Sequence, residues 1–74
     1  MKTGEIWFHN DFLILIGKKK PNDMWMVAPF GDCLGNLNDS IKHIRSRSPN
    51  YWVFNEISGN DIRRRYQKLY EDQL

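Results

Sequence analysis

The sequence contains very few of the residues that stabilise small proteins covalently or through metals. Cys33 is its only cysteine, and His9 and His43 are its only histidines. One cysteine cannot form an intramolecular disulfide, and a tetrahedral zinc site needs several closely spaced Cys or His ligands. The segment GDCLGN, residues 31–36, lacks the Lys-Ser/Thr ending of a phosphate-binding P-loop. We therefore expect no metal, no small-molecule cofactor and no catalytic residues.

Long apolar runs are also missing. A membrane-spanning helix needs about 18 or more apolar residues, whereas the run FLILI, residues 12–16, has five. The same run is too short for the core of a signal peptide. We expect a soluble cytoplasmic protein with Cys33 reduced and with no membrane partner.

Aromatic residues are plentiful for a chain of this length. With 74 residues we expect a single domain, residues 1–74, and ten of these residues are Phe, Trp or Tyr. A chain this short buries only about 60% of the surface of its unfolded form, so a few large side chains must build its core. The net charge of +2 permits binding to nucleic acid or to an acidic protein and favours neither.

The first half of the sequence predicts three antiparallel strands. In residues 4–10, GEIWFHN, a strand would place Ile6 and Phe8 on one face and Trp7 on the other. The continuous apolar run at 12–16 is typical of a strand covered on both faces. Residues 24–30, MWMVAPF, should pair with this run across a turn at residues 20–23. Pro29 cannot donate a ladder hydrogen bond, so we expect a bulge, an edge or the strand end there.

The middle of the chain has two possible structures. Apolar residues recur three or four positions apart at Leu34, Leu37, Ile41 and Ile44. This spacing favours a short helix, capped by Asn38 and ending near Ser46, over an edge strand. Four strong β-formers, YWVF at residues 51–54, then predict a further strand.

The last segment predicts a helix over residues 60–74. Ser58 and Asp61 have the spacing of a capping box. The apolar stripe that would dock this helix comprises Ile62, Tyr66 and Leu69. The fold class is therefore α+β and mainly β: a small bent antiparallel sheet or SH3-like barrel of about four strands, with a C-terminal helix and, in the favoured interpretation, a short middle helix.

Three tryptophans are more than so small a core can bury completely, so at least one should face a partner. Trp25 is our first choice, because Met24 and Met26 flank it and methionines give an adaptable contact surface. The alternative is that Trp25 packs in the core. Lys42, Arg45 and Arg47 lie close before Tyr51 and would supply steering charge or further contacts.

A nucleic-acid interface is the alternative function. Two groups of basic residues could form it. The expected hairpin contains Lys18, Lys19 and Lys20, and the first turns of the expected C-terminal helix contain Arg63 and Arg64. Basic side chains of this kind contact phosphates. Each group also has a structural explanation: lysines keep a hairpin soluble, and arginines on successive helix positions point in different directions and pair with neighbouring acids.

The sequence resembles small phage-encoded proteins with an SH3-like or KOW-like barrel. The matching residues are Gly4, Ile6, Trp7, Trp52, Ile57, Ile62, Tyr66 and Leu69. The resemblance implies a non-enzymatic accessory protein in the host cytoplasm that binds and modulates a host protein with an acidic face. The start GEIW is also similar to toxin endonucleases of the MazF and PemK type, which makes a small nuclease a distant alternative.

Overall fold

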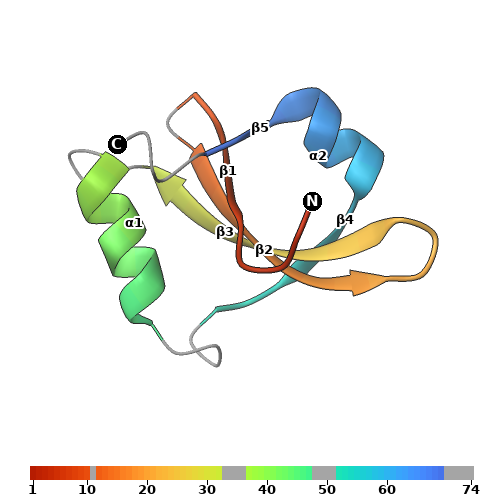
Figure 1. Cartoon of the computed structure of the whole chain (residues 1–74), viewed down its shortest axis with the longest axis horizontal. Helices are drawn as coiled ribbons and strands as arrows, with labels where there is room; N and C mark the ends of the chain where they lie inside the picture. The colour runs from red at the N-terminus through yellow and green to blue at the C-terminus, as the bar shows by residue number, and fades with distance from the viewer. Residues whose placement is uncertain (11, 33–36, 48–51, 70–74) are drawn as a thin grey trace.

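The computed structural model describes residues 1–10, 12–32, 37–47 and 52–69. Five strands form one antiparallel sheet in the order β4-β3-β2-β1-β5. Figure 1 shows α1 and α2 flanking this sheet at opposite ends. The elements are β1 (Ile6–His9), β2 (Phe12–Lys20), β3 (Met24–Asp32), α1 (Leu37–Ser46), β4 (Asn55–Ser58), α2 (Gly59–Arg65) and β5 (Gln67–Lys68). The mainly-β, α+β class is confirmed, with one strand more than expected.

The three-strand meander at the start of the chain is confirmed. β1 pairs with β2, and β2 pairs with β3, both antiparallel. The turn between β2 and β3 comprises Pro21, Asn22 and Asp23, and the last two have positive φ angles of 64° and 57°. Asn and Asp tolerate this left-handed conformation better than most residues, which explains why the turn forms here.

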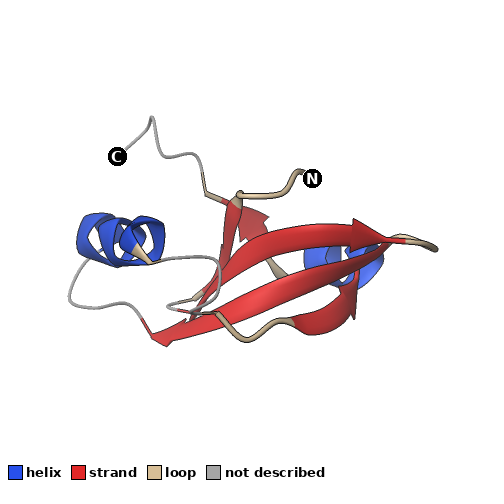
Figure 2. Cartoon of the chain, turned by 90° about the horizontal axis from the view of Figure 1, so that it is seen from below, coloured by secondary structure: helices blue, strands red, loops and turns tan. Residues whose placement is uncertain are grey.

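Two register shifts bend the sheet. Leu13 pairs with Gly31 but Ile14 pairs with Pro29, so the pairing skips a residue beside the proline, as the sequence predicts. A second shift lies between Ile16 and Lys19 on β2. Bulges increase the local twist, and Figure 2 shows the strands curving strongly along their length.

Both faces of the sheet carry packed side chains, as expected for the continuous run in β2. Ile14 and Ile16 pack with Trp25, Val27 and Ile62, which comes from α2. Leu13, the neighbour of Ile14 on β2, belongs to a second cluster with Ile6, Ile41 and Ile44. Ile41 and Ile44 lie on α1, so the predicted middle helix and its end at Ser46 are confirmed. The predicted cap is wrong, because α1 begins at Leu37 and Asn38 lies within it.

The strand predicted for residues 51–54 is wrong in position. Residues 52–54 are not in a strand, Tyr51 lies outside the described residues, and β4 begins at Asn55. The two aromatic side chains pack instead: Trp52 lies with its ring centroid 5.8 Å from that of Phe30, and Phe54 lies against Gly17. Their preference for strands is overridden by these tertiary contacts.

The C-terminal helix is also shorter than predicted. Its cap is confirmed, since Ser58 Oγ accepts a hydrogen bond from the Asp61 amide at 3.1 Å. However, α2 ends at Arg65, and Tyr66 is extended with φ −116° and ψ 159°. The chain then forms β5, which pairs with β1. Strand pairing therefore replaces the helix at Gln67 and Lys68, and residues 70–74 lie outside the described residues.

Candidate functional site

Trp25 is not a surface anchor. Its side chain is only 6% exposed and packs with Ile16 and Ile62 in the core between the sheet and α2. Its indole nitrogen donates to Asp23 Oδ1 at 3.3 Å. The prediction that Trp25 is the part-exposed tryptophan is therefore wrong, and its core alternative is correct. Met24 and Met26 are half-buried.

A short sequence pattern explains how two tryptophans are accommodated. The Trp7 indole donates to Glu5 Oε1 at 3.2 Å, and the Trp25 indole donates to Asp23 Oδ1. In both cases the acid stands two residues before the tryptophan in the sequence. Each carboxylate lies just before the strand that carries its tryptophan and accepts from the indole two residues later. Trp7 and Trp52 are only half-buried, so the prediction that the core does not bury all three tryptophans completely is confirmed, although the buried one is Trp25.

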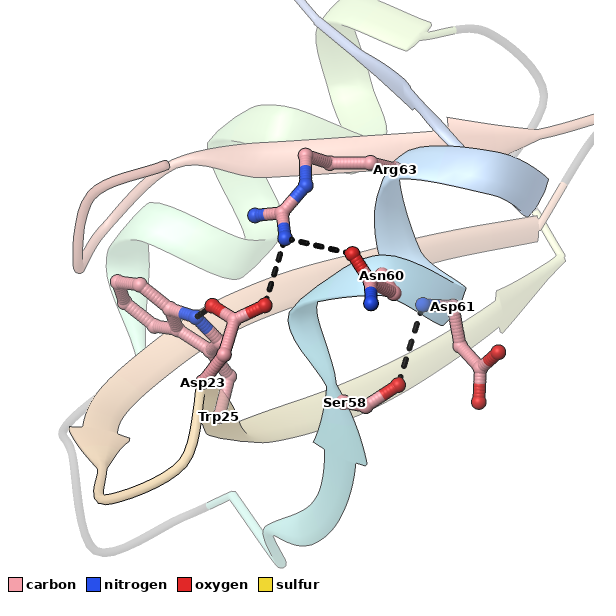
Figure 3. A network of polar contacts seen from close by, with 6 residues as sticks. All are labelled: Asp23, Trp25, Ser58, Asn60, Asp61 and Arg63. Carbon is pink, nitrogen blue, oxygen red and sulfur yellow. Dashed lines mark hydrogen bonds and ion pairs between the residues drawn. The ribbon is translucent and has the colours of Figure 1, made fainter.

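Asp23 connects the β2–β3 hairpin to α2 (Figure 3). Its Oδ2 accepts a hydrogen bond from Arg63 Nη2 at 2.6 Å, and its backbone carbonyl accepts from the Gly59 amide at 2.6 Å. Arg63 also donates to Asn60 Oδ1 at 3.2 Å. The hydrogen bond from Arg63 has the largest effect and holds the pKa of Asp23 below its ordinary value; burial opposes it, and the weaker effect of the Trp25 hydrogen bond supports it. Arg63, a predicted nucleic-acid contact, thus has a structural partner.

Glu5 forms a second group of polar contacts just before β1, beside β5. Burial raises its pKa, but hydrogen bonds from the Lys2 amide, Lys68 and Trp7 outweigh this effect and lower the pKa to about 2. Lys68 Nζ lies 2.9 Å from Glu5 Oε2. This ion pair helps to hold β5 beside β1.

The strongest candidate for partner binding is an apolar groove of about 250 Å³ near the end of α1. α1, the bulged part of β2, the segment before β1 and the segment before β4 contribute to it. Most of its lining is apolar, and two arginines belong to it. The lining residues are Thr3, Gly4, Leu15, Ile16, Gly17, Ile44, Arg45, Arg47, Trp52 and Phe54.

Close backbone packing shapes the floor of this groove. A Cβ on Gly17 would lie 2.6 Å from Phe54 Cε1 and 2.9 Å from the Met26 carbonyl oxygen. Gly17 is therefore required where the Phe54 ring crosses β2. At one edge, Arg45 Nη1 donates to the Gly4 carbonyl at 2.7 Å, which ties the end of α1 to the segment before β1.

The structure divides the predicted partner-binding set. Arg45 and Arg47 line the groove, whereas Lys42 is exposed on α1 outside its lining. Met24 lines a separate hollow beside β4 and α2. Tyr51 lies outside the described residues.

The predicted nucleic-acid set is divided as well. Lys18, Lys19 and Lys20 are exposed at the end of β2. Arg63 and Arg64 instead line a cleft of about 410 Å³ that involves α2, β1 and β5. The lysines are not among its lining residues, so the two basic groups do not form one site.

The groove is too small for most cofactors. Pockets for drug-sized ligands have volumes of about 300–1,000 Å³, whereas this groove has about 250 Å³. It suits one large apolar side chain better than a whole small molecule. Within the described ranges, no group of three His, Cys, Asp or Glu residues is placed to hold a metal ion. No helix in the described part of the chain is long and apolar enough to cross a membrane.

Comparison with protein-family models, with curated proteins and with solved structures finds no significant match to this chain.

Proposed function

We propose that the protein is a non-enzymatic binding module, which receives an acidic segment of a partner protein at the groove beside α1. The observation that carries this proposal is the pairing of an apolar floor with two arginines at one small concavity. Such a surface offers both parts of a typical protein interface, an apolar anchor site and a charged rim.

The floor supplies the anchor site. Leu15, Trp52 and Phe54 are only partly buried, although each packs on neighbouring apolar groups. Trp side chains are enriched among the residues that dominate binding energy. Beside them, Val53 is 79% exposed, so an apolar side chain of the partner would extend a surface that is already largely apolar.

The arginines determine which partner fits. Arg45 is held by the Gly4 carbonyl, so its charge is fixed at the edge of the groove. Arg47 is exposed one residue beyond α1. Guanidinium groups bind carboxylates in a bidentate fashion, and charges at the rim of an interface accelerate association with partners of opposite charge. The partner segment should therefore carry Asp or Glu beside its apolar anchor.

We propose an SH3-like arrangement, supported by the pairing of the last strand, β5, with β1 and by the strong bend of β2. With the resemblance noted above, this supports a phage-type accessory factor that modulates a host protein.

A peptide selection tests the proposal. A library of random peptides is selected against the protein, and the enriched peptides are titrated by isothermal calorimetry. Enriched peptides should contain one large apolar residue flanked by acidic residues. Arg47→Glu should weaken their binding by about fivefold, or about 1 kcal/mol, because one rim contact changes sign.

Lys20→Glu is the matched control, because it makes the same charge change at an exposed position outside the groove. It should leave the affinity within about twofold of the wild type. Failure to enrich such peptides, or equal effects of the two variants, would overturn the proposal.

A further inference from the structure

A second concavity is lined by residues from the end of α2, from β5 and from the end of β1. Its volume of about 410 Å³ lies within the range of about 300–1,000 Å³ that is usual for small-molecule sites. Three consecutive arginines and two aromatic side chains belong to its lining. The lining residues are Phe8, His9, Asn10, Arg63, Arg64, Arg65, Tyr66 and Gln67.

Within the described residues, the lining of this cleft carries charge of one sign. None of the described residues that line it is acidic. Arg63 is engaged by Asp23, but neither Arg64 nor Arg65 forms an ion pair with a residue in the described ranges. Both are exposed. Two guanidinium groups in a cleft whose described lining contains no carboxylate are suited to bind an anion, above all a phosphate.

The helix dipole explains only part of this arrangement. The C-terminal end of a helix is partly negative, so basic residues in the last turn of α2 stabilise it. Stabilisation of the helix dipole would not require that the arginines line a concavity or lie beside aromatic rings. Here the exposed His9 ring lies at the end of β1 and contacts Tyr66 edge to face, with 6.1 Å between ring centroids. Aromatic rings beside arginines are what stacked, unpaired bases require.

We propose that this cleft binds a nucleotide unit of single-stranded nucleic acid. Arg64 and Arg65 contact its phosphates, and the exposed His9 ring stacks with its base. The cleft is large enough for one splayed-out unit, whereas recognition of a duplex requires an element that enters one of its grooves. It shares no lining residue with the groove beside α1, so this site goes beyond the proposed protein-binding function and the two are tested separately.

Fluorescence anisotropy with a labelled single-stranded oligothymidylate at low salt tests the site. The double variant Arg64→Gln/Arg65→Gln should bind about tenfold more weakly. It should also reduce the slope of log affinity against log salt by about 1.4, because each phosphate contact on a single strand contributes about 0.7. His9→Ala should weaken binding by about fivefold through lost stacking.

Lys18→Gln/Lys42→Gln is the matched control, since it removes the same charge from two exposed side chains outside the cleft. Its affinity should stay within about twofold of the wild type. The proposal is overturned if this control weakens binding as much as the arginine variant. It is also overturned if a duplex of equal length, thymidine monophosphate alone or an acidic peptide binds the cleft as tightly as the single strand.

Discussion

Asp23 Oδ2 lies 2.6 Å from Arg63 Nη2 and thereby joins the tip of the β2–β3 hairpin to α2. The two residues are distant in sequence, and their side chains are about half exposed, at 43% and 47%. An ion pair of such exposure contributes little alone. The contact matters because the same aspartate also accepts from the Trp25 indole and, through its backbone, from the Gly59 amide.

Substitutions of Asp23 should separate these contributions. Asp23→Asn keeps an acceptor for Trp25 and tolerates the φ of 57°, but it removes the charge facing Arg63. Asp23→Ala removes the acceptor and disfavours the positive φ as well. We expect the free energy of unfolding in urea to decrease slightly for Asp23→Asn and clearly more for Asp23→Ala. Equal losses for both would mean that the charge alone matters.

Gly59→Ala should destabilise the protein although alanine favours helices. A Cβ at this position would lie 2.5 Å from both carboxylate oxygens of Asp23. The aspartate would have to move away from Arg63, and overpacking of this kind costs about 1–3 kcal/mol. In an Asp23→Ala background the same glycine substitution should cost nothing or stabilise slightly. Urea denaturation of all four proteins measures this coupling, and an unchanged cost in that background would disprove it.

Stability should decrease on acidification as Glu5 becomes protonated. Its pKa falls from 4.5 to about 2 in the folded protein. The unfolded chain therefore binds more protons between these values, and this contribution is complete above pH 4.5 and lost as the pH falls towards 2. Allowing for solvent screening, it amounts to about 1–2 kcal/mol.

Glu5→Gln should make thermal unfolding less dependent on pH across this window. Glutamine retains an acceptor for the Trp7 indole, so the variant isolates the charge that faces Lys68. Circular dichroism melting curves between pH 2 and 5 provide the measurement. If Glu5→Gln showed the full wild-type acid sensitivity, the lowered pKa of Glu5 would not be its source.

Gly17→Ala should be among the more damaging single substitutions at the groove. The added methyl would meet the Phe54 ring at 2.6 Å and the Met26 carbonyl oxygen at 2.9 Å. We expect a loss of about 1–3 kcal/mol in urea denaturation. Phe54→Leu should relieve part of this loss but not all, because the backbone oxygen remains in place. Complete relief would show that the Met26 carbonyl is not a constraint.

The predictions that succeeded depend on local sequence signals. The three- and four-residue spacing that includes Ile41 and Ile44 places α1, the missing amide of Pro29 places a bulge, and the Ser58 cap places the start of α2. Each signal acts within a few residues of the structure that it specifies. Such features are encoded by backbone chemistry and the side-chain period.

The predictions that failed concern contacts between distant segments. Nothing near Arg65 ends the helix; α2 stops because Gln67 and Lys68 pair with β1. The burial of Trp25 likewise depends on Ile62, which is distant in sequence. Preferences of short segments are weak compared with such tertiary contacts.

The candidate groove was only partly foreseeable for the same reason. Arg45 and Arg47 belong to a visibly basic stretch, but Thr3, Gly17 and Phe54 have no local feature that indicates a binding surface. They meet because β2 is bent where Gly17 permits close packing. Sequence patterns identified the charge at the groove, and the fold supplied its apolar floor.

The most direct test of the account is to locate a bound acidic peptide by NMR. An isotope-labelled sample is titrated with a peptide enriched in the selection, and the backbone amide shifts are followed. The account predicts that the largest changes fall on residues of the groove, with Leu15, Ile44, Arg47 and Trp52 among them. Largest changes in the cleft around Arg64, or at the hairpin lysines, would contradict it.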